Sequence, residues 1–181
     1  MNKNNIIAFL SVFAFFGSAM YFPYTTTPVK IKYPEYWPKP VYNFEKNPLT
    51  QEGIDLGRKL FYDPILSKDS SISCSNCHLS YTAFTHVDHK LSHGINDSIG
   101  NRNSPSLMNL AWHNSFMWDG AVSHLDFQAL APISHPAEMG ENINNVILKL
   151  TKSTDYVKRF YQTFKDSAIT GEYLLKAISQ F

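Results

Sequence analysis

The sequence predicts an all-α fold with long loops, and three observations lead to this prediction. Apolar residues recur at helical spacing in three consecutive stretches after Gly140. No alternation of apolar and polar residues is long enough to indicate a β-strand. The 181 residues are enough for one domain with a hydrophobic core, and they contain no internal repeat.

Residues 1–20 have the pattern of an export signal. Lys3 supplies a short positive region, and residues 6–16 form an apolar run that is broken only by Ser11. Small residues then suit a signal peptidase, and the run is shorter than the roughly 20 residues that span a membrane. We therefore expect a signal peptide and a periplasmic protein, with an uncleaved N-terminal anchor as the alternative.

Residues 21–48 form a proline- and aromatic-rich linker. Six prolines lie in this segment, with tyrosine and tryptophan between them. Prolines at this density prevent a helix and favour an extended chain. We expect a strap that lies along the surface and has no chemical role.

A helix is expected from residue 50 to about residue 62. Thr50 is a suitable N-cap, and Asp63-Pro64 ends the helix because the residue before a proline disfavours helical geometry. One face of the helix carries Ile54, Gly57, Leu60 and Phe61. Gly57 in this face indicates either close packing against a flat surface or a chance glycine.

The middle of the chain is expected to be mostly loop. Residues 67–73 and 79–101 are polar or rich in histidine and glycine. A short helix is expected within residues 102–120. A helical turn is expected at residues 125–130, and Pro132 should end it.

The three periodic stretches after Gly140 predict three consecutive helices. They cover residues 143–150, 156–164 and 173–181. The last apolar face stops at Phe181 without a capping glycine or a polar tail. We therefore expect a chain that is truncated.

Residues 74–78 read Cys-Ser-Asn-Cys-His, which is the attachment sequence of a c-type haem. Cys74 and Cys77 lie three positions apart and can each form a thioether to one porphyrin. His78 then supplies the proximal ligand of the iron. These are the only two cysteines of the chain, and export agrees with haem attachment outside the bacterial cytoplasm.

Three other interpretations compete with haem. A thioredoxin-like site would need strand-rich flanks, and a disulfide between Cys74 and Cys77 would close a strained, very short loop. Together with His89 and His93, the cysteines also have a spacing close to that of a zinc finger. The export signal, the single copy and the lack of a basic recognition helix favour haem over zinc. A net charge of +1 also gives no electrostatic argument for nucleic acid binding.

Five motifs in the same order resemble bacterial di-haem cytochrome c peroxidases. The similarity extends to the di-haem enzyme that matures the tryptophan cofactor of methylamine dehydrogenase. The motifs are Leu56-Gly57-Arg58-Lys59-Leu60-Phe61-Tyr62-Asp63-Pro64, Ser71-Ile72-Ser73 with the haem sequence, Arg102-Asn103-Ser104-Pro105-Ser106-Leu107, Trp118-Asp119-Gly120, and Gln128 through Pro132 to Glu138-Met139-Gly140.

This resemblance implies a division of the chain into segments. Residues 49–181 would form a cytochrome c-like domain with the peroxidatic haem, after the signal peptide and the linker. Family members carry a second haem domain that receives electrons from a small cytochrome c or a cupredoxin. That second domain would be missing here, because the chain has one C-x-x-C-H sequence.

The resemblance also assigns residues to the haem pocket. Gln128 and Glu138 would be the distal pair, and Pro132 would line the same pocket. A carboxyl group with a raised pKa can move the peroxide proton from the near oxygen to the far one, whereas an amide can only orient peroxide. Without the resemblance, Glu138 would read as a solvated loop acid. Trp118 would conduct electrons between two haems, or serve only as a core aromatic.

Further assignments concern the rim of the haem and the iron. Arg102 would pair with a haem propionate, and Asn103 would lie near a calcium site at the domain interface. Ala121 stands where the family usually has arginine. Ile95 stands where many members have a removable sixth ligand to the iron, so we expect an open distal side, with His93 as the alternative ligand.

Two functions follow from these expectations. The first is a peroxidase that reduces hydrogen peroxide to water with electrons from a second haem domain or a donor protein. The second is a mono-haem electron carrier, which would need a methionine such as Met108, Met117 or Met139 on the iron. The sequence leaves open whether calcium binds, whether the protein is a homodimer, and what the natural donor is.

Overall fold

The computed structural model describes residues 25–181, and the predicted export signal at residues 1–20 lies outside them. The described chain is helical, with isolated bridges and no β-strand, so the predicted all-α class is confirmed. The α-helices are α1 (Gln51–Tyr62), α2 (Cys74–Cys77), α3 (Leu125–Gln128), α4 (Leu130–Ser134), α5 (Ile143–Thr151), α6 (Thr154–Phe164) and α7 (Gly171–Gln180). Four short 3-10 helices, η1 (Pro64–Leu66), η2 (Ser80–Thr82), η3 (Ile95–Asp97) and η4 (Leu110–Trp112), lie in the loops.

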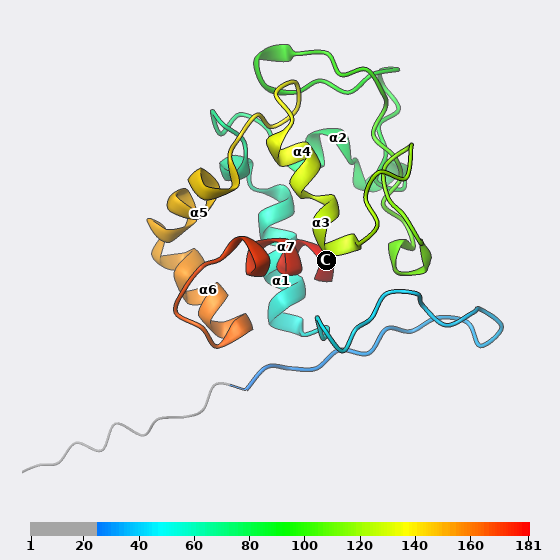
Figure 1. Ribbon diagram of the computed structural model, residues 1–181, viewed down its shortest axis with the longest axis vertical. Coiled ribbons are helices and arrows are strands. Elements are labelled where there is room, and N and C mark those ends of the chain that lie inside the picture. Colours follow the sequence, from blue (N-terminus) through cyan, green and yellow to red (C-terminus); the bar gives the residue numbers. More distant parts are fainter. Residues whose placement is uncertain (1–24) are drawn as a thin grey trace, which may run out of the picture.

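Helix α1 lies at the centre of the fold and has the predicted ends (Figure 1). Thr50 Oγ1 accepts a hydrogen bond from the amide of Gly53 at 3.0 Å, which satisfies a free amide of the first turn. Asp63 leaves the helical conformation immediately before Pro64. The apolar face of the helix is buried against α6 and α7.

The crossing of α1 and α7 depends on Gly57. A Cβ atom added at Gly57 would collide with the main-chain carbonyl of Ala177. The close packing that the sequence indicated at Gly57 is therefore present, and its partner is helix backbone. This contact brings the end of α7, including Phe181, alongside Phe61 with ring centroids 5.3 Å apart.

Helices α5, α6 and α7 occur where the sequence predicts three helices. Each begins at a polar N-cap whose side chain accepts a main-chain amide, and these caps are Asn142, Ser153 and Thr170. Their apolar faces form one core with α1, built from Leu56, Leu60, Leu66, Val146, Leu150, Tyr156, Phe160, Leu174 and Ala177. The mostly irregular segment 67–142 packs against this core through Ala129, Ile133 and Met139.

Two predictions about the middle of the chain are wrong. Residues 102–120 do not form a helix, apart from the single turn η4, because Asn109 and Met117 adopt left-handed backbone conformations. Pro132 does not end the helical region but lies inside α4. It is the third residue of that helix, where a proline removes no intrahelical hydrogen bond.

Residues 25–48, which we call the strap, run in an extended path with turns, as predicted. The amides of Val41 and Tyr42 both donate to the carbonyl of Ala111, at 2.9 and 3.0 Å. Trp112 Nε1 donates to the carbonyl of Pro38 at 2.8 Å. The strap therefore lies along one side of the helical core, next to the loop around η4 (Figure 1). Across residues 25–181, no helix has the length and apolar character to cross a membrane.

Candidate haem site

Cys74 and Cys77 lie at the two ends of α2, a single turn of helix. Asn76 Oδ1 fixes the start of this turn by accepting hydrogen bonds from the amide and the hydroxyl of Ser73, at 2.8 and 2.9 Å. Neither thiol is in a disulfide. The two sulfur atoms are therefore both available on one short, capped turn, as two thioether bonds to a porphyrin require.

His78 follows directly and is held in one orientation. Its Nδ1 lies 2.7 Å from the carbonyl oxygen of Phe84. Because a carbonyl can only accept, Nδ1 carries the proton and Nε2 keeps a free lone pair. Burial lowers the pKa of His78, so the neutral imidazole is favoured. A neutral ring with a free Nε2 is the form that binds iron.

The structure does not assemble the zinc finger spacing into a site. Cys77 Sγ contacts the main-chain carbonyl of His93, at 3.6 Å. Burial raises the pKa of the Cys74 thiol to about 12. Within the described residues, no group of three or more His, Cys, Asp or Glu side chains is placed to hold a metal ion.

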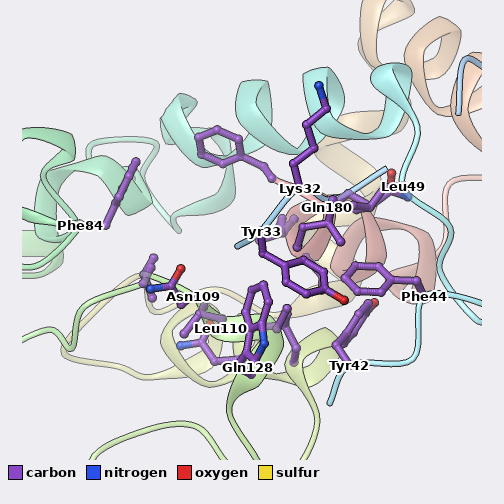
Figure 2. A pocket seen from close by; sticks show the side chains of 18 of the residues that line it. Lys32, Tyr33, Tyr42, Phe44, Leu49, Phe84, Asn109, Leu110, Gln128 and Gln180 are labelled. Atoms are coloured by element: carbon purple, nitrogen blue, oxygen red, sulfur yellow. The ribbon is translucent and has the colours of Figure 1, made fainter. Parts of the chain in front are cut away.

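A cavity of about 460 Å³ opens beside Phe61, whose ring centroid lies 6.4 Å from that of His78. Phe84, whose carbonyl fixes His78, lies at one end, and the strap residues Tyr42 and Phe44 lie at the other (Figure 2). Gln128 and Leu110 lie between these ends. The other aromatic residues that line the cavity are Tyr33, Trp37, Phe61, Trp112 and Phe181. The paired thiols and the neutral imidazole fit a haem c. The mainly apolar cavity lies beside them, and Phe61 and Phe84 contact His78 and also line the cavity.

Gln128 ends α3 and borders this cavity. Its Nε2 lies 3.7 Å from Met117 Sδ, so the amide has only a weak partner among the described side chains. Helix α3 itself is held by Asp126, which accepts a hydrogen bond from the Tyr42 hydroxyl at 2.7 Å. Gln128 is thus fixed by its helix, and its amide remains available for a further hydrogen bond.

Glu138 lies in the loop after α4. In the sequence, Gln128 precedes Pro132 and Glu138 follows it. The amide of Met139 donates to the carbonyl of Pro132 at 3.2 Å, and the amide of Ile95 donates to the carbonyl of Glu138 at 2.8 Å. Burial raises the pKa of Glu138, and the nearby His135 opposes this shift. The charge of Glu138 also acts to raise the pKa of Cys77, so the carboxyl lies near the haem-attachment turn.

Trp118, Arg102 and Asn103 lie together at the surface. Trp118 is 63% exposed, and its Nε1 donates to the carbonyl of Asn103 at 2.7 Å. Arg102 forms an ion pair with Asp119 at 2.7 Å, and Asn103 Nδ2 donates to the carbonyl of His86 at 2.9 Å. A held but exposed tryptophan is typical of an interface. The pairing of Arg102 with a propionate and the calcium site at Asn103 stay predictions.

His93 contacts a neighbouring acid, and its role as the alternative iron ligand stays a prediction. Its Nδ1 lies 2.7 Å from Asp97 Oδ1, and its ring centroid lies 4.9 Å from that of His89. His86 continues this row, 5.3 Å from His89. Ile95 is buried and packs against Gly140.

The structure also shows important residues that the sequence did not single out. Asp126 and Glu141 are buried acids that lie two residues before Gln128 and three residues after Glu138. The partner of Asp126 is Tyr42, 84 residues earlier in the chain, and the partner of Glu141 is Lys149, which lies in the following helix α5. Neither periodicity nor a local motif reveals such a pair, although their closeness in sequence to the predicted distal residues was a usable signal.

Residues 51–181 match the protein family described as di-haem cytochrome c peroxidase. This match covers most of the chain, so the chain belongs to the di-haem cytochrome c peroxidase family, and the resemblance of the five motifs is confirmed. Members of this family bind c-type haem, and their peroxidases reduce hydrogen peroxide.

Individual relatives agree with the family assignment. The chain is 32% identical over 159 residues to the methylamine utilization protein MauG of Methylorubrum extorquens, covering 84% of this chain and 42% of that protein. It is 32% identical over 150 residues to the cytochrome c peroxidase Ccp of Escherichia coli, covering 82% of this chain and 32% of that protein. The chain thus spans well under half the length of these relatives.

A solved structure shows the same fold. The crystal structure of a MauG-like protein associated with microbial copper homeostasis superposes with a TM-score of 0.76 and 32% identity. The superposition covers 84% of this chain and 45% of that protein. The fold expected from the resemblance, an all-α haem domain with long loops, is therefore confirmed.

Proposed function

We propose that residues 49–181 form the peroxidatic haem domain of a di-haem peroxidase that reduces hydrogen peroxide to water. The observation that carries this proposal is Glu138, a loop carboxyl whose pKa is raised by burial close to Cys77. The Glu138 side chain is 40% exposed, and a fully solvated loop acid would not have this shift in pKa. A carboxyl with a raised pKa can both accept and return a proton near neutral pH.

The residues of the site divide the work of the reaction. The haem, when bound, supplies the redox chemistry at its iron. Cys74 and Cys77 would attach the haem, and His78 would bind its iron through Nε2. Glu138 takes the proton from the near oxygen of peroxide and returns it to the far oxygen, and Gln128 orients peroxide by hydrogen bonding.

The overall reaction consumes two electrons and two protons for each peroxide and releases two water molecules. The exposed Trp118 supports electron entry across the surface that it shares with Arg102 and Asn103. The donor would be a second haem domain, itself supplied by a small cytochrome c or cupredoxin. Calcium near Asn103 and a periplasmic location after export complete the proposal.

A rapid-mixing experiment tests this function. The chain is loaded with haem c and mixed with hydrogen peroxide, and the haem absorbance and the peroxide concentration are followed. We expect Glu138→Gln to slow the reaction by about 10²–10⁴-fold, the usual share of general acid–base catalysis. Glu172→Gln on α7, an exposed acid remote in sequence from the site, is the control and should leave the rate unchanged. Equal rates for all three proteins would refute the proposal.

The alternative is a mono-haem electron carrier, and Met117 is the observation in its favour. Its thioether lies beside Gln128, whereas Met139 is buried in the core and Met108 is half exposed. A thioether on the iron would keep it low-spin and closed to cyanide. A high-spin ferric spectrum that converts to low spin with cyanide would exclude this alternative and leave the peroxidase.

A further inference from the structure

Among the acidic side chains of residues 25–181, only Asp126 and Glu141 are buried, with 8% and 7% of their surface exposed. Burying a carboxylate is costly unless it is paired and hydrogen-bonded. Glu141 is the better compensated of the two, because its partner is a lysine. It also lies three residues after Glu138, in the same loop. Glu141 and its lysine partner, Lys149, have no part in the peroxide chemistry described above.

Glu141 uses both of its oxygen atoms. Oε2 accepts a hydrogen bond from Lys149 Nζ at 2.7 Å. Oε1 accepts the amide of Asn142 at 2.9 Å and the side-chain amide of Asn145 at 3.1 Å. Burial acts to raise the pKa of Glu141, but these hydrogen bonds hold it below its ordinary value. Glu141 is therefore a fully bonded, ionised carboxylate.

Lys149 connects Glu141 to a second segment of the chain. Its ammonium also donates to the carbonyl of Ser67 at 2.6 Å, and its remaining N–H is shared between the carbonyls of Lys68 and Ile65 at 3.3 and 3.4 Å. Ile65 lies in η1, and Ser67 and Lys68 lie in the loop that leads from η1 into the haem-attachment helix α2. Lys149 thus holds the end of η1 and the loop of Glu138 from one atom on α5.

The two segments also touch directly. The amide of Lys68 donates to the carbonyl of Met139 at 2.9 Å, next to Glu138. On the opposite side, a Cβ atom added at Gly94 would collide with the carbonyl of Ala137. Within the described residues, the carboxyl of Glu138 has one ion-pair partner, His135 at 3.7 Å. The position of the Glu138 carboxyl is therefore determined by the backbone contacts of its loop.

We propose that Glu141 and Lys149 form a positioning pair, which holds the loop of Glu138 at a fixed distance from the haem-attachment turn. This inference rests on the proposed peroxidase function for its catalytic consequence. A displacement of about 1 Å at a reacting group can cost on the order of 10²-fold in rate. The pair acts only through Glu138 and does not contact peroxide itself.

The test compares the double variant Glu141→Gln/Lys149→Met with the control Glu172→Gln/Lys176→Met. The first removes both buried charges together, so that neither remains unpaired. The second removes an ion pair of 2.6 Å between residues four apart on α7. Both are loaded with haem c. Hydrogen exchange of the amides of Lys68 and Ile95, and the rate of reaction with peroxide, are measured.

We expect both amides to exchange at least about 10-fold faster in the first variant, and the peroxide rate to fall by about 10–100-fold. In the triple variant with Glu138→Gln, the rate should be no lower than in Glu138→Gln alone, because the pair acts through that carboxyl. The control should match the wild type. Additive rate losses, or unchanged exchange at Lys68 and Ile95, would overturn the inference.

Two outcomes separate this inference from the proposed function. If the wild-type chain does not react with peroxide, the function fails, and the exchange of the Lys68 and Ile95 amides still decides whether the pair holds the loop. If the double variant does not bind haem, Lys149→Arg replaces it. A guanidinium keeps the charge but cannot reproduce the three-carbonyl contact. Unchanged exchange at Lys68 in that variant would contradict the inference.

Discussion

Gly57 of α1 lies directly against the main-chain carbonyl of Ala177 in α7, with no room for a Cβ atom between them. Helices α1 and α7 make more contacts with each other than any other pair of elements in residues 25–181. The crossing therefore joins the first and last helices of the described fold. It also brings Phe181 to the cavity wall beside Phe61.

Gly57→Ala should destabilise the fold although alanine favours helices. The better helix propensity contributes about 1 kcal/mol, whereas the collision with Ala177 forces the helices apart and costs about 1–3 kcal/mol or more. We expect a lower free energy of unfolding in urea. Gly171→Ala is the control, since its Cβ would meet Ile143 at an ordinary 3.4 Å. An equally stable Gly57→Ala protein would disprove the account of the crossing.

The raised pKa of Glu138 predicts a pH dependence of stability. Between the ordinary pKa of glutamate, about 4.3, and the raised value, the folded state binds more protons than the unfolded state. The contribution of Glu138 to the free energy of unfolding therefore decreases as the pH rises through this window. Glu138→Gln should remove this slope. Urea unfolding at several pH values measures it, and an unchanged slope would count against burial of the carboxyl.

Cys74→Ala and Cys77→Ala should each retain covalent haem through the remaining thioether. The double variant should lose covalent attachment but can still bind haem through His78. Mass spectrometry of the denatured proteins distinguishes these cases, and Ser75→Ala, between the two thiols, is the control. A wild-type chain that carries no covalent haem after expression with the attachment machinery would refute the haem assignment.

Trp118→Phe should slow electron transfer to the haem without changing the stability of the fold much. The side chain is mostly exposed, and its loss removes one hydrogen bond to Asn103, worth about 1 kcal/mol. We expect the rate of reaction with peroxide to stay the same and the re-reduction by a second haem domain to slow. Phe127→Leu, another exposed aromatic, is the control. Equal re-reduction in Trp118→Phe and the wild type would exclude the electron role.

Much of the fold could be predicted because its signals are local. Thr50 and Asp63-Pro64 mark the ends of α1 within a few residues, and apolar spacing marks α5, α6 and α7. The error at residues 102–120 has the opposite cause. Met117 adopts φ 69°, and no local signal in a methionine predicts a left-handed backbone.

In the candidate site, too, local sequence patterns reveal some residues and miss others. The attachment turn and His78 are contiguous, so one short sequence reveals them. The contact between Lys149 and Ser67 joins residues 82 positions apart and depends on how α5 packs against η1. Such contacts exist only after the core has formed, so a reading of local patterns cannot find them.

The strap has a consequence for how this sequence can vary. Its bonds to Ala111 come from main-chain amides, which every residue except proline possesses. Substitutions at Val41 should therefore be accepted widely, while Pro38 and Trp112 are linked through an indole that phenylalanine cannot replace. A library of strap variants could accordingly reshape the wall of the cavity while its backbone path is kept, which makes residues 25–48 the natural place to engineer ligand access.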